Sequence, residues 1–577
     1  MAEEKQKSRV RGPDDALTKL ILGRQSKLEA DKVRFNDRMQ EAADYVAPHR
    51  EDILGTRQPG EKKGTKIYDG TAQGAAVLAA DGIHGYHVSP AFPWFKYVVN
   101  RKEVNQIHDV RAWLDEVEFN MYMALNRSNF YSEVWSYIFD GLTLGTPPLY
   151  AEEDLKSGRI VFESIHPGEA FVQENRFGEI DLLHRKRKLT ARKMVQLFGK
   201  ESLSEDVNNA YEKQPFTEFE VIHCVFPREE YDDRMKDAKN KRFASAWLVT
   251  TGNYIARESG FDQFPYFVWR YMRSGKEPYA ITPAYLAMAD IKGLNLMGKT
   301  LLAAAQLSVD PAYNIPDYLE GKVMLRPRGQ NFLKKGDSIT PVNAGDKYPL
   351  GIDREQAKQM AIKERFHVDT FLMLASLEGR GQRTAYEVSE LMAEKAAVLG
   401  AELGPLNTEL DHILDRVYDI EVAAGRMPSP PDILYEMAAK DPSLRFDPVY
   451  MGPLAQAQRE RFSKDGIRKF LVEIAPLVQI QAAASGGSAE ILDNFDMDEA
   501  SRILADSNNV PAAMVRPKEA RDKMRQARTD ALRQANQDAQ MQQGADMVKT
   551  ISEADRNMGG KLTNGMQQMM GGNGAAV

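Results

Sequence analysis

The sequence predicts an α+β protein built from several domains, and three observations lead to this prediction. The chain has 577 residues, which is too long for one ordinary hydrophobic core and favours about two to four domains. Hydrophobic residues make up 43% and charged residues 28%, as in a folded protein. Segments with helical spacing of apolar residues alternate with short segments rich in β-branched and aromatic residues.

Composition argues against several classes of protein. No apolar run approaches the roughly 20 residues that span a bilayer, and the charged start "MAEEKQKSRVRGPDD" is not expected to be a signal peptide. A single cysteine, Cys224, excludes an intrachain disulfide framework and a zinc cluster of thiolates. Assembly in a cytoplasm, with no membrane partner, is therefore expected. The net charge of −7 argues against gripping nucleic acid by overall attraction.

Residues 1–275 are predicted to form one mixed α+β domain. Helices are expected at 15–46, from a cap at Asp69 or Thr71 through Gly82, near 105–128, at 130–141, and at 190–199 with Gly199 as its end. The strand candidates are "GRIVFESI", "EAFVQEN", "EIDLLHRKR", "TEFEVIHCVF", "FASAWLVTTGNYIARES" and "PYFVWRYM".

Two helices that flank a β segment are predicted next. Thr282 is a good N-cap and Pro283 occupies the first helical position, so a helix is expected over 283–308. Residues 309–352 are rich in Pro, Gly and strand formers and predict a small β insertion. Asp353 and Gln356 form a variant of the capping box, which predicts a second helix to about Ala375.

A loop with two glycines and two arginines, "EGRGQR" at 378–383, precedes the longest helical pattern. Thr384 and Glu387 form a capping box, and apolar residues then recur at helical spacing for about 40 residues. Pro405 should kink this helix, and Gly425 should end it. Further helices are expected at about 453–483 and 497–540, and the Gly/Gln/Met-rich tail is expected to be disordered.

Three motifs were considered as sites of chemistry. The segment "GLNLMGKT", 293–300, matches the phosphate-binding P-loop pattern, but it lies inside a predicted helix whose N–H groups are already bonded. His84 and His87 have a spacing that could serve a metal, but most such histidines are structural. The run "HRKRK", 184–188, could touch nucleic acid, although a solvated face is the favoured interpretation. No catalytic residue, metal site or cofactor is therefore predicted.

Several stretches, in this order, resemble portal proteins, the head-to-tail connectors of short-tailed bacteriophages. They are "IYDGTAQGAAVLAADGIHGYHVSPAFPWF" at 67–95, "VWRYMRSGKEPYAITPAYLAMADIKGLN" at 268–295, "RTAYEVSE" at 383–390, "LGPLNTEL" at 403–410 and "MGPLAQAQR" at 451–459. The similarity covers about residues 15–480. Ala280 and Tyr386 depart from the family, which more often has Gly and a smaller residue there, so the local turn and the helix entry can differ.

The resemblance implies a ring-forming, multidomain portal fold with an α/β wing, a helical stem, a small β clip, a long kinked helix and a helical crown. The implied division is a disordered segment at 1–14, the wing at 15–280, stem helix 1 at 281–308, the clip at 309–352, stem helix 2 at 353–375, the tunnel loop at 376–384, the long kinked helix with the rest of the wing at 385–450, the crown at 451–543 and a disordered tail at 544–577.

The resemblance also implies roles for particular residues. The tunnel loop would line a DNA channel, with glycines for backbone freedom and arginines near the phosphates: Glu378, Gly379, Arg380, Gly381, Gln382 and Arg383. Alternatively, Arg380 and Arg383 pair with acids such as Glu378. The clip would dock the motor and the adaptor through Lys322, Arg326, Arg328, Lys334 and Lys335. The stem helices of one copy would pack against those of the next copy through Ile291, Leu294, Leu301, Ile362, Phe366 and Met373.

The function implied is a channel at one capsid vertex, through which double-stranded DNA is packaged and ejected. The expected partners are other copies in a ring of twelve, non-specifically bound double-stranded DNA, the terminase large subunit, the tail adaptor, and the major capsid and scaffold proteins. The expected location is the virion, after assembly in the host cytoplasm. Two alternatives stay open: a P-loop ATPase of the packaging motor, which would need Lys299, and another structural capsid or scaffold protein.

Overall fold

The computed structural model describes residues 15–50, 53–55, 60–105, 107–154, 156–232, 237–319, 321–342, 348–376, 385–452, 473–479, 481, 496–507 and 514–557. The chain divides into two compact units. The first covers residues 1–104 and 113–480, and the second covers 105–112 and 481–577. Within the described residues, no helix is both long enough and apolar enough to cross a bilayer.

The first helices follow the sequence signals, with one difference in length. They are α1 (Ala16–Tyr45), α2 (Thr71–His87), α3 (Lys102–Asn105), α4 (His108–Arg127) and α5 (Phe130–Thr143). The Asp15 side chain caps α1 by accepting from Leu17 N at 3.1 Å. The expected end of α2 at Gly82 is wrong, because the helix continues to His87. Position 82 is a glycine for a packing reason, since the Phe371 ring lies where a side chain would begin.

A five-stranded antiparallel sheet lies beside α1, in the order β4-β5-β6-β7-β8. Its strands are β4 (Ala170–Glu174), β5 (Ile180–Thr190), β6 (Glu218–Pro227), β7 (Phe243–Val249) and β8 (Tyr254–Phe261). Ile21 and Leu28 of α1 pack on Phe171, Leu182 and the buried, free Cys224. Met194 of α6 (Ala191–Phe198) and Val207 of α7 (Glu205–Lys213) pack against Val221, Val249 and Tyr254.

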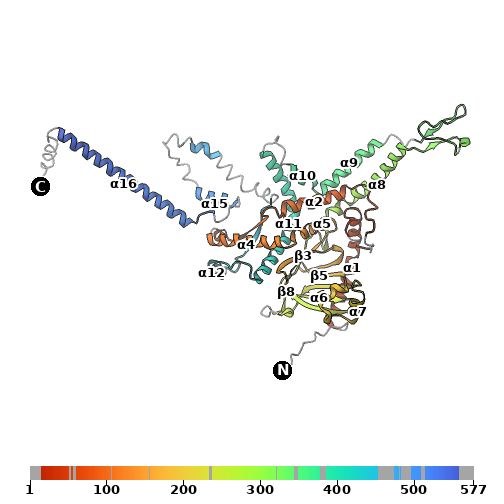
Figure 1. The fold of residues 1–577 in the computed structure, drawn as a ribbon, viewed down its shortest axis with the longest axis horizontal. Helices are drawn as coiled ribbons and strands as arrows, with labels where there is room; N and C mark the ends of the chain where they lie inside the picture. Colours follow the sequence, from red (N-terminus) through yellow and green to blue (C-terminus); the bar gives the residue numbers. More distant parts are fainter. Residues whose placement is uncertain are drawn as a thin grey trace, which may run out of the picture. The chain divides into compact units, whose positions relative to one another are not determined.

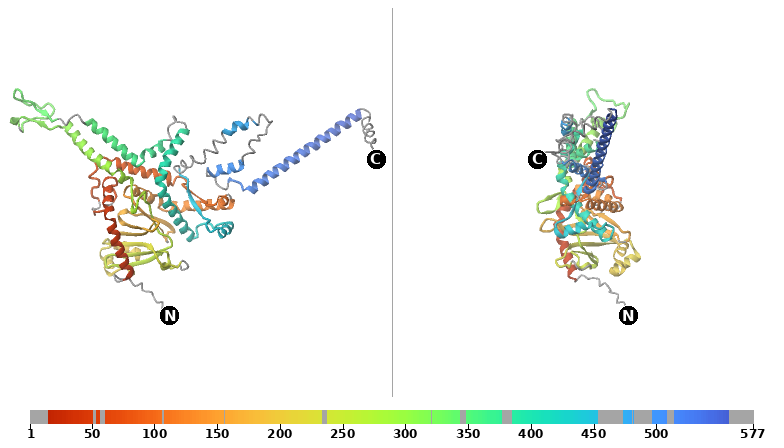
Figure 2. Two further views of the ribbon diagram at one scale, coloured as in Figure 1. Left: turned by 180° about the vertical axis from the view of Figure 1, so that it is seen from behind. Right: turned by 90° about the vertical axis from the view of Figure 1, so that its left-hand side faces the viewer.

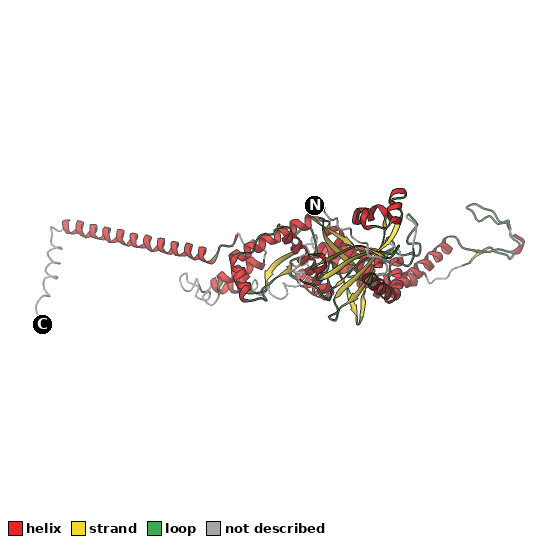
Figure 3. Cartoon of the chain, turned by 90° about the horizontal axis from the view of Figure 1, so that it is seen from below, coloured by secondary structure: helices red, strands yellow, loops and turns green. Residues whose placement is uncertain are grey.

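Smaller sheets complete the strand content, and most of the strands are grouped in the same region of the first unit (Figure 3). A three-stranded sheet has the order β3-β2-β9, formed by β2 (Pro148–Asp154), β3 (Arg159–Ser164) and β9 (Tyr266–Val268). A hairpin joins β10 (Met272–Ser274) to β11 (Glu277–Ile281). Finally, β1 (Phe95–Val99) pairs antiparallel with β14 (Phe446–Tyr450).

Two helices, α8 (Pro283–Val309) and α9 (Tyr348–Arg365), lie side by side and extend away from the sheets (Figures 1 and 2). The predicted second helix is wrong in two respects. Helix α9 begins at Tyr348, so Asp353 lies inside it and does not cap it. It also ends at Arg365, and a separate helix α10 (Val368–Ser376) follows a left-handed residue, His367, with φ 53°.

The long predicted helix is α11 (Ala385–Ala423), which contains Pro405. Gly425 follows it with φ 70°, in the left-handed conformation expected after a helix. Helix α12 (Asp432–Lys440) then leads to β14. The expected C-terminal helix at 497–540 is instead two helices, α15 (Met497–Ser507) and α16 (Lys518–Asn557). Helix α16 extends into the tail predicted to be disordered from 544, because Ala, Met, Lys and Glu in residues 544–557 favour helix without requiring a core.

Candidate functional site

The helix pair is anchored to the rest of the first unit at the N-terminus of α8. Thr282 Oγ1 accepts a hydrogen bond from Tyr285 N at 3.1 Å and donates one to the Thr143 carbonyl, also at 3.1 Å. The Tyr285 hydroxyl donates to the Leu144 carbonyl. The predicted cap is confirmed, and it also ties α8 to the end of α5. The direction of α8 is therefore fixed where the helix begins.

The P-loop pattern at 293–300 lies entirely inside α8. Helical N–H groups in the interior already donate to the preceding turn, so this segment cannot cradle a phosphate. A Cβ at Gly293 would lie 3.3 Å from Cε of Lys358 on α9, and a Cβ at Gly298 would lie 3.6 Å from Cβ of Tyr68. The two glycines thus allow close approach of neighbouring segments, and the nucleotide-binding alternative loses its structural basis.

A buried amide, Asn295, connects the helix pair to the start of α2. Its Oδ1 accepts from Tyr68 N at 2.8 Å and from Asp69 N at 3.3 Å, and its Nδ2 donates to the Ile291 carbonyl at 2.9 Å. Asp69 in turn accepts from Thr71 N at 2.7 Å and from Gln359 Nε2 of α9 at 2.8 Å. One chain of hydrogen bonds thus holds α8, α9 and the N-terminus of α2 together.

The apolar side chains of the helix pair fall into two groups. Ile291, Leu294, Ile362 and Phe366 are buried within the single chain, and Leu301 is half-buried. The side chain of Met373 lies outside the described set. The exposed group is Leu296, Leu302, Leu307 and Val309 on α8, with Met360 on α9. A neighbouring copy is not needed to cover the four buried residues, whereas the exposed group has no cover within the described chain.

The segment between α8 and α9 contains less β structure than the sequence predicts. Tyr313 and Asn314 pair with Pro341 and Thr340, forming β12 (Tyr313–Asn314) and β13 (Thr340–Pro341). The described residues 321–329 contain no strand, and the chain bends and turns at 326–328. Pro327 lacks an N–H for strand pairing, and Arg328 has φ 63°, so neither supports an extended ladder.

The predicted cations of this segment, Lys322, Arg326, Arg328, Lys334 and Lys335, are all exposed. Lys334 makes two contacts with Tyr318. Its Nζ lies 4.5 Å from the centre of the Tyr318 ring, and its backbone N–H donates to the Tyr318 hydroxyl at 2.9 Å. The Tyr318 hydroxyl donates to Asp337 at 2.7 Å. Exposed Met324, Leu325 and Phe332 accompany the cations, so this surface is both positive and apolar.

The predicted DNA-contacting loop, Glu378, Gly379, Arg380, Gly381, Gln382 and Arg383, lies outside the described residues. The structure describes the helices on either side of it, α10 and α11. His84 and His87, the metal candidates, each contact a protein group. His84 Nε2 lies 3.1 Å from the Tyr131 carbonyl, and His87 Nε2 lies 2.5 Å from Asn407 Oδ1. Neither contact requires a metal.

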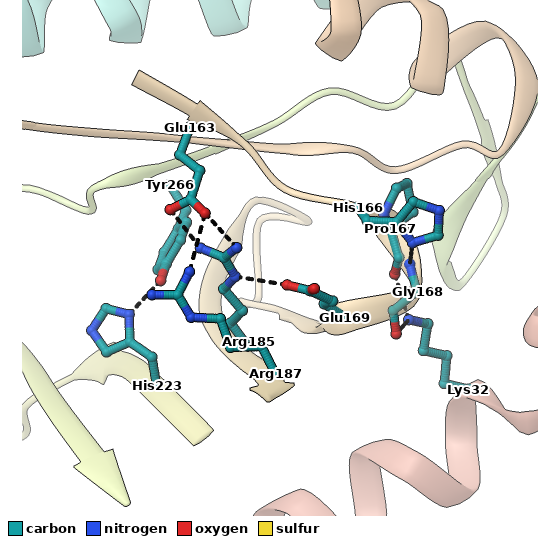
Figure 4. A network of polar contacts seen from close by, with 10 residues as sticks. All are labelled: Lys32, Glu163, His166, Pro167, Gly168, Glu169, Arg185, Arg187, His223 and Tyr266. Atoms are coloured by element: carbon teal, nitrogen blue, oxygen red, sulfur yellow. Dashed lines mark hydrogen bonds and ion pairs between the residues drawn. The ribbon is translucent and has the colours of Figure 1, made fainter. Parts of the chain in front are cut away.

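The basic run 184–188 is solvated only at its end, where Lys188 is exposed, so the favoured interpretation is wrong for His184 and Arg185. It lies within β5, where side chains alternate between faces, and His184 and Arg185 are buried. Arg185 pairs with Glu163 at 2.6 Å and with Glu169 at 3.0 Å, and Arg187 reaches Glu163 at 3.1 Å (Figure 4). These cations are neutralised inside the protein and are unsuited to contacting nucleic acid.

Lys32 of α1 is a buried cation that sequence patterns did not single out. Its ammonium donates to the carbonyls of Pro167 and Gly168 at 2.6 and 3.1 Å (Figure 4). It also donates to the carbonyl of Ala170 at 2.7 Å. Burial lowers the pKa of Lys32 to about 7, and the charge of Glu169 opposes this effect. The lysine fastens α1 to the turn before β4. Only its apolar neighbours at helical spacing, Ile21, Leu28 and Met39, signalled that this face of the helix is buried.

Comparisons with known proteins give a consistent result. The sequence model of a family described as bacteriophage head to tail connecting protein matches residues 18–515. The portal protein of Salmonella phage epsilon15 is 28% identical over 560 residues, which covers 94% of this chain and 97% of that protein. The probable portal protein of Bordetella phage BPP-1 is 26% identical over 560 residues, with 95% and 97% covered.

Proposed function

This chain belongs to the family of bacteriophage head-to-tail connecting proteins, and from this premise we propose that it is a portal protein whose copies close into a ring at one capsid vertex. Double-stranded DNA passes through the ring during packaging and ejection. The match of the family model over residues 18–515 is the observation that carries the proposal. The role is structural rather than catalytic, and the virion is its location.

The helices α8 and α9 are proposed as the stem of the ring. This proposal is supported by the exposed apolar side chains of the two helices, and Val309 among them is 88% exposed. The group consists of Leu296, Leu302, Leu307, Val309 and Met360. Apolar side chains on a helix pair that leaves the main core favour association, because burial against a neighbour removes them from water. Repeated around a ring, each pair would cover the next. A ring of twelve copies is proposed from the family resemblance.

The segment 309–352, whose residues 348–352 belong to α9, is proposed as the clip, which docks first the terminase large subunit and later the tail adaptor. Its exposed cations and its neighbouring Phe332, 84% exposed, support a docking role. A positive surface attracts an acidic partner over several ångströms, and an exposed aromatic ring can then anchor it. Contacts with the major capsid and scaffold proteins are proposed for the outer part of the ring, without assigned residues.

The remaining divisions are proposals of the same kind. Residues 15–280 with 385–450 form the wing, and helices after 451 form the crown. The loop 376–384 is proposed to line the channel. Gly379 and Gly381 give its backbone conformations that other residues avoid, and Arg380 and Arg383 place cations near the phosphates. A ring of charge positions DNA without reading its sequence, which suits a conduit.

Imaging of the purified protein by electron microscopy tests the ring directly. We expect closed rings with a central hole about as wide as a DNA duplex. Leu302→Glu, which places a charge in the exposed apolar group, should shift the population from rings to monomers, while Gln306→Glu, on the same helix and exposed, should leave rings intact. Particles without a central hole would contradict the proposed ring. If the fraction of protein in rings is the same for both variants, the proposed role of α8 and α9 as the stem is wrong.

The loop is tested by changing Arg380 and Arg383 to Ala together and measuring the DNA retained in filled heads. A fall in retained DNA is expected if both cations face the phosphates. Glu378→Gln is the matched control for the alternative in which the arginines pair with that carboxylate. If the double variant fills and retains DNA as the parent does, the loop does not have the proposed role.

A further inference from the structure

Two residues, Phe366 and His367, join α9 to α10, and His367 has the left-handed backbone conformation at φ 53°. Residues other than glycine seldom adopt this conformation, and Asn, Asp and His are the side chains that tolerate it best. The His367 carbonyl accepts from Thr370 N at 3.0 Å and from Phe371 N at 3.3 Å, so α10 starts its own hydrogen-bond ladder there. The direction of α10 therefore depends on how His367 is held.

One carboxylate, Glu402 of α11, holds the His367 ring. His367 Nε2 lies 2.9 Å from Glu402 Oε2, and the Tyr271 hydroxyl donates to the same carboxylate. Partial burial raises the pKa of Glu402, but the hydrogen bonds from His367 and Tyr271 outweigh it and lower the pKa overall. The histidine side chain is 25% exposed and that of Glu402 is 30% exposed, so the contact can open without unfolding the core.

The rest of the attachment of α10 is apolar. The Phe371 ring occupies the space beside Gly82 of α2, where any side chain would overlap it. A cavity adjoins this contact and includes both His367 and Glu402 in its wall. The apolar part of that wall is formed by Ala79, Ile83, Leu142, Pro283, Leu399 and Leu403. The packing around the Phe371 ring is therefore not completely filled on the side of His367 and Glu402.

We propose that His367, Glu402 and Tyr271 form a latch that fixes the direction of α10 relative to α9 and α11. The left-handed backbone of His367 favours release, and the contact with Glu402 opposes it, so a small change at either residue alters the balance. The consequence for DNA rests on the proposed function, because α10 and α11 are the two helices that bracket the loop assigned to the channel. The latch residues act by positioning those helices.

Hydrogen exchange on the full chain tests the latch. His367→Asn keeps a residue that tolerates the left-handed conformation but is too short to reach Glu402, and Glu402→Gln removes the charge at constant size. Amides of residues 368–376 should exchange about tenfold faster in each variant, as the loss of a charge-assisted hydrogen bond implies. The double variant should exchange no faster than either single variant, because both remove the same contact.

The control is Glu436→Gln, which removes an exposed carboxylate from α12 and should leave exchange in α10 unchanged. The midpoint temperature of global thermal unfolding should change little in any of these variants. A role in general packing would instead lower that midpoint. Unchanged exchange in α10 for both His367→Asn and Glu402→Gln would overturn the latch, whatever the outcome for rings or DNA.

Packaging assays then separate the latch from the proposed function. Variants that form normal rings, with faster exchange in α10, should retain less DNA than the parent. Faster exchange with normal DNA retention would refute the link between α10 and the channel. Failure of the parent protein itself to form rings would refute the proposed function and leave the exchange result standing.

Discussion

Gly82 of α2 and Phe371 of α10 share one space: a methyl group at position 82 would overlap the aromatic ring. Phe371 is 5% exposed, and Phe366 and Ile362 beside it are also buried. The two helices can touch only because one of them has no side chain at the contact. This explains why the apolar, alanine-rich pattern of α2 contains a glycine in its last turns.

Gly82→Ala should lower the free energy of unfolding by about 1–3 kcal/mol, since the ring must move out of a packed site. Denaturant unfolding at a fixed protomer concentration measures the change. Gly85→Ala is the matched control, because it lies in the same helix with nothing within 4 Å of its Cβ position. The control should be neutral or stabilise by about 0.5–1 kcal/mol through helix propensity. Equal effects at both positions would show that the contact does not constrain α2.

Lys32→Met should destabilise the protein by about 2–4 kcal/mol, because three buried carbonyls lose their donor at once. Thermal and denaturant unfolding provide the measurement. Lys27→Met changes an exposed lysine on the same helix and should have an effect within about 0.5 kcal/mol. If Lys32→Met unfolds like the control, water replaces the ammonium at no cost and the proposed fastening of α1 to the turn before β4 is wrong.

The free energy of unfolding is expected to depend on pH because of Glu409 in α11. Burial raises its pKa from 4.5 to about 8, against the opposing effects of the hydrogen bond from Val268 N and the charge of Arg270, while the charge of Glu179 adds to the increase. The folded state therefore keeps a proton that the unfolded state releases, so the free energy of unfolding falls as pH rises from about 4.5 to 8.

Glu409→Gln keeps an acceptor for Val268 N, which lies 3.1 Å from Glu409 Oε2, and removes the titration. The variant should lose part of the decline in unfolding free energy across that interval, and above pH 8 it should be more stable than the parent. Unfolding at a series of pH values measures this, with the exposed carboxylate variant Glu436→Gln as the reference. An unchanged slope for Glu409→Gln would mean that the carboxyl titrates normally in the folded protein.

Asn295→Ala should destabilise the first unit by about 1–3 kcal/mol, because the backbone N–H groups of Tyr68 and Asp69 lose their acceptor in a partly buried site. Hydrogen exchange should rise at the start of α2, which Asp69 supports. Gln306→Ala, an exposed change on the same helix, serves as the comparison. If hydrogen exchange becomes faster only within α8 in the Asn295 variant, the Asn295 side chain stabilises only its own helix.

Local signals predicted the elements that local interactions decide. Thr282 with Pro283 marked the start of α8, and Thr190 with Gly199 marked the limits of α6, because caps and helix ends depend on neighbouring residues. The prediction of α8 also explains why the P-loop pattern at 293–300, which lies inside this helix, cannot bind phosphate. The charges in "HRKRK" do not indicate that His184 and Arg185 are buried, because their partners, Gln25 and Glu163, lie on α1 and β3.

The features that the sequence did not predict depend on contacts between residues far apart in the chain. His367, at the break between α9 and α10, contacts Glu402 on another helix, and β1 pairs with β14, a strand far along the chain. Lys32 finds its carbonyls far along the chain. Nothing near these residues in the sequence distinguishes them, because their partners are set by the fold. The loop 378–383 remains a prediction, since it lies outside the described residues.

The pairing of β1 with β14 has a consequence for synthesis on the ribosome. Asn100, at the end of β1, donates to the carbonyl of Ser443, 343 residues later. At roughly 5–20 residues per second, β1 waits for tens of seconds before its partner strand is made. Until then Phe95 and Tyr97 lack their strand neighbour, so a nascent chain cannot complete this part of its fold.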